Sequence, residues 1–213
     1  MQIRLQKLVP IYFEQDKIIN SQVWAQDVIL TKGEHTHIIA ASGRGKTSLI
    51  HFIYGLRKDY EGDVYYENEN VDSLSREKFS LLRQKNISIV FQDLRLFSTQ
   101  TVMENLEIKR RLSPYHPQEK IIEMAKRLGI ESKLTKLAST CSYGEQQRIA
   151  IIRSLLQPFD FLLLDEPFSH LDDNNRQIAM NLIAEECSIR NASMIFADLK
   201  ERNFFNDKRI LLL

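Results

Sequence analysis

A glycine- and lysine-containing turn early in the chain places the strongest limit on its fold. The segment Ala-Ala-Ser-Gly-Arg-Gly-Lys-Thr-Ser spans residues 40–48. A brief apolar run leads into it, and apolar residues at helical spacing follow it as far as Leu56. A turn between a strand and a helix gathers backbone N–H groups at the positive end of the helix dipole, where an anion binds. The pattern therefore predicts a phosphate-binding loop within an α/β fold.

The residue types in this turn suit a nucleoside triphosphate and Mg²⁺. Gly43 and Gly45 lack a β-carbon, so the backbone there can approach phosphate oxygens closely. Lys46 supplies a cation for the β- and γ-phosphates, and Thr47 offers a hydroxyl to Mg²⁺. Ala40 stands where the usual pattern begins with glycine, which is a mild departure only if its φ is negative. Taken alone, the motif also fits an ordinary strand-to-helix turn.

A pair of carboxylates follows a buried-strand pattern later in the chain. Asp165 and Glu166 come directly after three leucines, which predicts that they emerge at the carboxyl end of a central strand. Ligands bind at that edge in open α/β sheets. Asp165 would hold Mg²⁺, and Glu166 would orient or deprotonate the attacking water. Two solvated acids at a strand end are the alternative, but the phosphate loop upstream favours the catalytic role.

Strand and helix patterns alternate along the chain and predict an α/β core with a mainly parallel sheet. Polar and apolar residues alternate over about 1–32, which predicts an N-terminal antiparallel β subdomain. An amphipathic helix with a serine cap is expected over Ser73–Arg83. Further strands are expected at 62–66, 87–91, 159–164 and 193–197, and a helix at 144–157. We expect one domain over residues 1–213, with an inserted helical subdomain at about 94–140, where Pro114, Pro117 and Gly129 interrupt the helical pattern.

Composition excludes several classes of protein. The chain has 28 acidic and 29 basic residues, so no strong charge indicates a nucleic-acid partner or an anionic membrane. No apolar run approaches the roughly 20 residues needed to span a bilayer, and the first residues contain no apolar signal segment. We therefore expect a soluble, cytoplasmic chain. The two cysteines and five histidines show no metal-ligand spacing, so a metal site built by protein side chains alone is not expected.

A third motif lies between the phosphate loop and the carboxylates. Residues 141–148 read Cys-Ser-Tyr-Gly-Glu-Gln-Gln-Arg, which taken alone predicts a capped helix start with a polar run. This segment resembles Leu-Ser-Gly-Gly-Gln, the signature of the ATP-binding cassette (ABC) family, and the order of the motifs is that of the family. Ser142 and Gly144 retain the residue types that contact the γ-phosphate held by a second subunit. The other three positions differ: they hold Cys141, Tyr143 and Glu145.

The resemblance implies a P-loop NTPase core that binds ATP and Mg²⁺. Gln92 matches the glutamine that senses Mg²⁺ and contacts the membrane partner, and residues 169–172 match a loop that crosses the dimer interface. Tyr12 lies where the family places an aromatic residue against adenine, although Phe13 remains an alternative. The implied nucleotide-binding residues are Tyr12, Ser42, Gly43, Arg44, Gly45, Lys46, Thr47, Ser48, Ser142, Gly144 and Asp198. The implied catalytic residues are Glu166, Lys46 and Gln92, and the implied Mg²⁺ ligands are Thr47, Gln92 and Asp165.

One residue expected from the resemblance is missing. Family members place a histidine against the γ-phosphate at the end of a later strand, and here Asp198 follows the corresponding strand. His170 is the last histidine of the chain, so no shift of register supplies one. Two unit charges about 4 Å apart interact by about 4 kcal/mol at an effective dielectric constant of about 20, so a carboxylate there would repel the phosphate. We expect slow hydrolysis, with ATP binding and ATP-driven dimer closure retained.

The resemblance implies an ATP-binding, ATP-hydrolysing subunit that drives a separate integral-membrane permease from the inner face of the cytoplasmic membrane. A second cassette, expected to be another copy of this chain, would complete two nucleotide sites, and no nucleic acid would be bound. Within the family, the chain most resembles the subfamily that serves lipoprotein release, macrolide export and the cell-division complex. The alternative is a degenerate ATP-switched interaction module, which Asp198 and Ala40 favour and Glu166 and Lys46 oppose. Soluble ABC proteins of DNA repair or translation fit less well, because they carry two cassettes or a long coiled coil.

Overall fold

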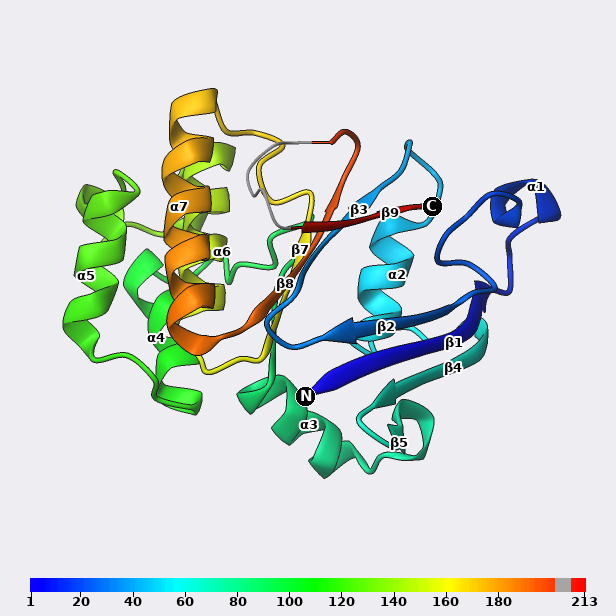
Figure 1. Ribbon diagram of the computed structural model, residues 1–213. Helices are drawn as coiled ribbons and strands as arrows, with labels where there is room; N and C mark the ends of the chain where they lie inside the picture. Colours follow the sequence, from blue (N-terminus) through cyan, green and yellow to red (C-terminus); the bar gives the residue numbers. More distant parts are fainter. Residues whose placement is uncertain (202–207) are drawn as a thin grey trace.

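Two β-sheets with helices packed against them make up the fold in the computed structural model, which describes residues 1–201 and 208–213 (Figure 1). In this part of the chain the larger sheet has five parallel strands in the order β6-β7-β8-β3-β9. Its strands are β3 (His35–Ile39), β6 (Ile87–Val90), β7 (Phe161–Asp165), β8 (Ser193–Asp198) and β9 (Lys208–Leu212). The carboxyl ends of β3, β6 and β7 therefore meet at one edge, as the sequence predicts.

The smaller sheet is antiparallel and contains the N-terminal part of the chain. Its strand order is β2-β1-β4-β5, with β1 paired to both β2 and β4. The strands are β1 (Gln2–Pro10), β2 (Asp27–Thr31), β4 (Tyr60–Tyr66) and β5 (Glu69–Asn70). The predicted antiparallel strands within residues 1–32 are confirmed. A short helix between them, α1 (Gln15–Ile18), was not predicted.

Helices cover both faces of the parallel sheet (Figure 1). Helix α2 lies between the two sheets, and the helices after α3 lie on the opposite face of the parallel sheet. The helices are α2 (Lys46–Ile53), α3 (Arg76–Lys85), α4 (Val102–Leu112), α5 (Gln118–Arg127), α6 (Tyr143–Leu155) and α7 (Asp173–Arg190). Short 3₁₀ turns occur at Val71–Ser73, Glu131–Lys133 and Ala138–Thr140. None of the helices in the described part of the chain is long and apolar enough to cross a membrane.

The predicted start of α3 is wrong by two residues. Ser75, and not Ser73, caps the helix, and its hydroxyl accepts a hydrogen bond from the backbone N–H of Lys78. The Ser73 hydroxyl donates instead to the carbonyl of Asn70, within the 3₁₀ turn. A local turn therefore uses the first serine before the helix begins.

The parallel sheet separates two apolar layers, and β7 contributes to both. Leu163 packs in the layer that contains α2 and the smaller sheet, whereas Leu162 and Leu164 pack in the layer that contains α4 to α7. All three side chains are fully buried. Because alternate side chains of a strand point to opposite faces, a strand covered on both sides is apolar throughout. This double burial holds the end of β7, with its carboxylates, at a defined position.

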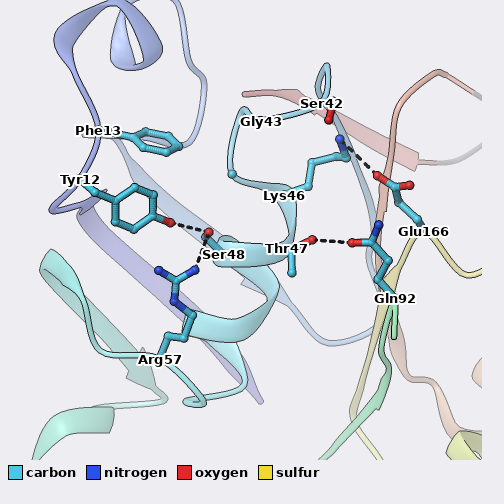
Figure 2. A pocket seen from close by; sticks show the side chains of 11 residues that line it. Tyr12, Phe13, Ser42, Gly43, Lys46, Thr47, Ser48, Arg57, Gln92 and Glu166 are labelled. Atoms are coloured by element: carbon cyan, nitrogen blue, oxygen red, sulfur yellow. Dashed lines mark hydrogen bonds and ion pairs between the residues drawn. The ribbon is translucent and has the colours of Figure 1, made fainter. Parts of the chain in front are cut away.

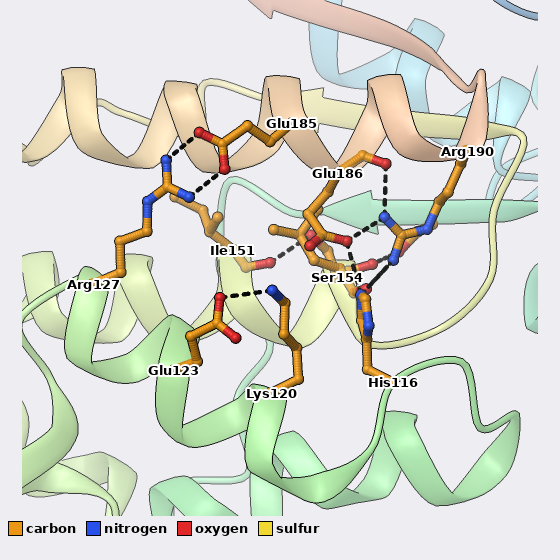
Figure 3. Close-up of polar contacts among 11 residues, drawn as sticks. His116, Lys120, Glu123, Arg127, Ile151, Ser154, Glu185, Glu186 and Arg190 are labelled. Carbon is orange, nitrogen blue, oxygen red and sulfur yellow. Dashed lines mark hydrogen bonds and ion pairs between the residues drawn. The ribbon is translucent and has the colours of Figure 1, made fainter.

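Polar contacts join α7 to the segment before α5 (Figure 3). Glu186 and Arg190 on α7 are almost fully buried and form an ion pair. The Arg190 guanidinium donates to the carbonyl of Leu155 over 2.9 Å and lies against the rings of Tyr115 and Phe159. His116 Nε2 lies 2.8 Å from both Glu186 Oε2 and Arg190 Nη2. These contacts fix the α4–α5 connection against α7.

Candidate functional site

A pocket of about 400 Å³ opens beside the phosphate loop at the carboxyl edge of the parallel sheet (Figure 2). Strand β3 delivers the loop, β6 delivers Gln92 and β7 delivers Glu166. Residues from the segments that follow β1 and α2 close the other side. The lining residues are Tyr12, Phe13, Ser42, Gly43, Gly45, Lys46, Thr47, Ser48, Arg57, Gln92 and Glu166. Most of the residues implied by the sequence therefore gather in one place.

The phosphate loop needs its second glycine for two physical reasons. Gly45 is the N-cap of α2 and has a φ of 89°, in the left-handed region that favours glycine. A β-carbon at this position would lie 2.8 Å from Phe13 Cζ and 2.9 Å from Trp24 Cζ2. Ala40 has no positive φ, so alanine in place of the usual first glycine is a mild departure.

The Lys46 ammonium is buried within the loop. It donates to the carbonyls of Ala40 and Ala41 over 2.9 and 3.2 Å, and lies 3.4 Å from Glu166 Oε1 (Figure 2). The side chain is only 5% exposed. Its shorter contacts are to neutral carbonyl oxygens and its contact to a carboxylate is longer, so a phosphate oxygen can replace these contacts and pair with the buried cation. Lys46 is therefore placed to bind the phosphates of a triphosphate.

Asp165 is fully buried, and neither of its carboxylate oxygens lies in good hydrogen-bond geometry to a donor among the described residues. Burial raises the pKa of this carboxyl group to about 6; the Thr47 hydroxyl lowers it and the Glu166 carboxylate raises it further. The Thr47 hydroxyl donates over 3.1 Å to Oε1 of Gln92 (Figure 2). Buried charges are normally paired or bound to a metal ion. Oxygen donors from these three residues are the ligands that Mg²⁺ prefers, so the residues fit this ion.

Glu166 has the backbone conformation that turns its side chain into the pocket. Its φ is 46°, which is uncommon for a residue other than glycine. Its backbone N–H donates over 3.0 Å to the carbonyl of Ala197 on the neighbouring strand. Backbone strain of this kind gathers at functional sites, where the surrounding structure maintains it. The carboxylate consequently lines the pocket, while Asp165 stays buried beneath it.

An aromatic pair and one arginine form the other end of the pocket. The Tyr12 hydroxyl lies 2.5 Å from the Ser48 hydroxyl, which also accepts from Arg57 Nη1 over 3.1 Å (Figure 2). The Arg57 guanidinium lies 5.1 Å from the centre of the Tyr12 ring. Tyr12 and Phe13 both line the pocket, so the two sequence alternatives for an aromatic residue against adenine stay open. Sequence reasoning missed Arg57 because no local motif marks it.

Arg44, an implied nucleotide-binding residue, has a side chain that points away from the pocket. Its guanidinium donates over 3.0 Å to the carbonyl of Asp16, and its own carbonyl accepts from the Trp24 indole over 3.2 Å. It is not one of the lining residues. Its contacts in this structure hold the loop against the N-terminal segment.

The signature segment, which the resemblance implies contacts the γ-phosphate held by a second subunit, lies outside the pocket, at the start of α6. Ser142 is the N-cap of α6 and forms a capping box with Glu145. The Ser142 hydroxyl accepts from the backbone N–H of Glu145 over 3.3 Å, and Glu145 Oε2 accepts from the backbone N–H of Ser142 over 2.7 Å. The Ser142 side chain also interacts with the Glu145 carboxylate, so the cap holds it at the N-terminus of α6. A β-carbon on Gly144 would meet the carbonyl of His170 at 3.0 Å.

Asp198 ends β8 beside the phosphate loop. It pairs with Ile39 on β3, and its carbonyl accepts from the backbone N–H of Ala40 over 3.2 Å. Its side chain is buried, and Oδ1 accepts from the backbone N–H of Leu199 over 2.6 Å. The carboxylate is therefore adjacent to the loop but does not belong to the pocket lining.

Known proteins share both the sequence pattern and the fold. The ABC transporter family model matches residues 26–169. The lipoprotein-releasing system ATP-binding protein LolD of Buchnera aphidicola subsp. Schizaphis graminum is 34% identical over 86% of this chain and 81% of its own length. The thiamine import ATP-binding protein ThiQ of Histophilus somni is 33% identical over 79% of this chain and 78% of its own length. A dimeric bacterial ABC transporter cassette, MJ0796, superimposes with a TM-score of 0.84 over 99% of this chain and 94% of its own, at 24% identity.

These likenesses agree with the motif order. The solved cassette confirms the predicted α/β fold with a parallel sheet, an antiparallel sheet and helices. The relatives from lipoprotein-releasing systems confirm the subfamily resemblance expected from the sequence. The family match covers most of the chain, and relatives above 30% identity span more than two thirds of it. The chain belongs to the ABC transporter family.

Proposed function

We propose that this chain is the ATP-binding subunit of an ABC transporter and that it couples ATP binding and hydrolysis to a separate integral-membrane permease. Relatives with this family's motifs are named as ATP-binding proteins of lipoprotein-releasing and thiamine import systems. The observation that carries the proposal is the meeting of Lys46, Glu166 and the buried Asp165 carboxylate at one edge of the sheet. The chain would work at the inner face of the cytoplasmic membrane, attached through its permease.

The pocket residues divide the work on Mg·ATP between them. The backbone N–H groups of the loop and the Lys46 ammonium bind the β- and γ-phosphates, and this binding fixes the reacting phosphorus. Asp165, Thr47 and Gln92 would hold Mg²⁺, which neutralises charge that develops on the phosphate oxygens. Glu166 orients the attacking water and takes its proton, because its carboxylate is the basic group that lines the pocket.

A second copy of this chain would complete each site. Ser142 and Gly144 lie on α6, outside the pocket of their own protomer, so they can serve a nucleotide held by another. The positive end of α6 suits a γ-phosphate, and the Ser142 hydroxyl would donate to it after turning its proton away from Glu145. The solved relative MJ0796 is described as dimeric. Head-to-tail pairing would thus bury two ATP molecules between Lys46 of one copy and Ser142 of the other.

Hydrolysis by this chain is proposed to be slow. Asp198 ends the strand beside the phosphate loop, where the family has a histidine, and its carboxylate adds negative charge near the γ-phosphate. The test is steady-state ATPase of the purified protein and of Asp198→His, with Mg·ATP affinity measured on both. The replacement is expected to raise turnover with little change in affinity. Equal turnover of parent and variant, at the rate of ordinary family members, would disprove slow hydrolysis.

Asp198 is also the feature that favours a purely ATP-switched module, for which the comparisons give no support.

Nucleotide binding is tested by removing the buried cation. We expect Lys46→Met to weaken Mg·ATP binding at least tenfold, which corresponds to about 1.4 kcal/mol. Lys58→Met is the matched control, because Lys58 is an exposed lysine whose partner is the surface carboxylate of Asp72. Equal affinity of the Lys46 variant, the control and the parent would overturn the proposal. Co-purification with an integral-membrane protein tests the transporter assignment separately.

A further inference from the structure

Tyr143 is a large side chain at a signature position where the family has glycine. It lies directly after Ser142, in the first turn of α6, and is 43% exposed. Its hydroxyl donates over 3.1 Å to the backbone carbonyl of Gln92. The centre of its ring lies 4.2 Å from that of His170. A glycine could make neither contact, so this chain has a side-chain connection that the family signature lacks.

Gln92 links the tyrosine to the residues around the nucleotide. Its side-chain oxygen accepts from the Thr47 hydroxyl, and its backbone carbonyl accepts from Tyr143. The two interactions are made by opposite parts of one residue at the end of β6. The Tyr143 ring also forms part of the wall of a hollow of about 370 Å³ that reaches Thr47. A displacement of Gln92 towards a bound cation would therefore act directly on the first turn of α6.

A second set of contacts runs from the tyrosine towards Glu166. His170 Nδ1 lies 2.9 Å from the Ser169 hydroxyl, and the backbone N–H of His170 donates over 3.1 Å to Oε1 of Gln147. Gln147 is buried on α6, and its amide nitrogen lies 3.2 Å from the Ser169 hydroxyl and 3.4 Å from the Glu166 carbonyl. Tyr143 thus connects the beginning of α6 to two segments of the protomer's own site, the one with Gln92 and the one with Glu166.

We propose that Tyr143 is a positioning residue that sets the place of Ser142 according to the state of the protomer's own nucleotide site. This inference rests on the proposed function, because it concerns the closed dimer in which Ser142 serves the second copy. Ser142 and Tyr143 are consecutive at the helix start, so anchoring one fixes the other. Mg·ATP bound by one protomer then places that protomer's Ser142 where it can contact the nucleotide held by its partner.

Because the Tyr143 side chain is partly exposed, its positioning role can be tested without disturbing the fold. The Tyr143 ring lies outside the apolar core, so its removal opens no cavity. Tyr143→Phe keeps the ring beside His170 and removes only the hydrogen bond to Gln92, whereas Tyr143→Gly restores the family residue and removes both contacts. Tyr115→Phe is the matched control, because Tyr115 is a tyrosine of similar exposure on the α4–α5 connection.

The experiment compares two equilibria in a Glu166→Gln background, in which slow turnover lets closure reach equilibrium. The first is Mg·ATP affinity of dilute monomer, measured by competition with a fluorescent ATP analogue. The second is the Mg·ATP concentration at which half of the chains dimerise, measured by sedimentation. Tyr143→Phe is expected to change the Mg·ATP affinity of the monomer by less than about twofold. It should raise the Mg·ATP concentration for half-dimerisation about fivefold, equivalent to about 1 kcal/mol for one lost hydrogen bond. Tyr143→Gly should raise it further, and Tyr115→Phe should change neither.

The outcomes separate the two proposals. If the parent closes with Mg·ATP and both Tyr143 variants close at the same concentration, the positioning role is wrong and the proposed function stands. A lower closing concentration for Tyr143→Gly also overturns it, because the ring would then obstruct the interface. If the parent binds Mg·ATP but never dimerises, both the dimeric function and the inference are wrong. A parallel loss of monomer affinity would show a structural effect and would also contradict the inference.

Discussion

The Glu166 carboxylate lies 3.4 Å from the Lys46 ammonium, so the proposed base and the phosphate-binding cation are already paired before a triphosphate enters. Both side chains line the same pocket (Figure 2). An incoming γ-phosphate must therefore compete with Glu166 for the lysine. Such competition would release the carboxylate from the cation, as the base role proposed for Glu166 requires.

Glu166→Gln should lower ATP turnover by at least about 100-fold, because a general base contributes roughly 10² to 10⁴ in rate. The same change removes a competing negative charge from Lys46, so Mg·ATP affinity should stay equal or rise. Steady-state phosphate release and an equilibrium binding titration measure the two effects. Glu185→Gln, an exposed carboxylate on α7, is the control and should change neither. Retained turnover in the Glu166 variant would show that another group activates the water.

Asp165→Asn should stabilise the metal-free protein at pH 7.5 while abolishing Mg·ATP turnover. The folded pKa of Asp165 is raised from 3.8 to about 6, so the folded state binds the proton more tightly than the unfolded state. Stability of the parent must then fall as the pH rises through this window. A rise of about two units is worth up to about 3 kcal/mol above pH 6, and asparagine avoids this cost.

Urea denaturation of the Asp165 pair without Mg²⁺ or nucleotide checks the sign. The variant should be more stable than the parent at pH 7.5, and the difference should disappear near pH 4, where the parent carboxyl group is protonated when folded. Mg·ATP affinity of the parent should also fall below about pH 6, because protonated Asp165 is a poor cation ligand. A difference in stability that is independent of pH would mean that packing, and not charge, separates the two proteins.

Much of the architecture can be predicted because the strands are covered on both faces. Leu162 to Leu164 are apolar without interruption, which identifies a central strand and places Asp165 at its end. Helix α7 was not predicted, although its buried Ala179, Ile183 and Cys187 recur every four residues. That signal was present in the sequence and was missed. The start of α3 could not be predicted, because Ser73 and Ser75 are equally good caps and only the turn at Asn70 distinguishes them.

Some residues of the site can likewise be predicted from the sequence, and others cannot. Residues within one loop, such as Gly45 and Lys46, carry a local pattern that the sequence reveals. Arg57 carries none, because it lies in the segment after α2 and meets Ser48 only when the chain folds back beyond that helix. Whether Tyr12 or Phe13 meets the base also depends on tertiary structure, which places both in the pocket. Positions that fold together from distant segments have no short spacing to detect.

Arg57→Ala should weaken ATP binding about five- to tenfold and leave the binding of inorganic triphosphate unchanged. The arginine donates to Ser48 and lies over the Tyr12 ring, at the end of the pocket away from Glu166 (Figure 2). A hydrogen bond and a cation–π contact are each worth about 1 kcal/mol. Competition titrations with ATP and triphosphate measure the difference. Arg4→Ala, which removes a similar contact over Tyr65 outside the pocket, should affect neither ligand. Equal weakening for both ligands would place Arg57 at the phosphates.

Arg190→Met should destabilise the fold by about 3 kcal/mol, because it leaves the buried carboxylate of Glu186 without its cation (Figure 3). The control is Arg127→Met, which breaks the exposed pair with Glu185 on the same helix and should cost less than about 1 kcal/mol. Burial alone would raise the pKa of Glu186, but the hydrogen bond from His116 and the charge of Arg190 hold it below its ordinary value of 4.5. The stabilisation is therefore complete above pH 4.5 and is lost as the pH falls through the folded pKa. Urea denaturation of the parent and both variants at pH 7 and at pH 4 should show the Arg190 deficit shrinking in acid, whereas an unchanged deficit would assign it to lost packing against Tyr115 and Phe159.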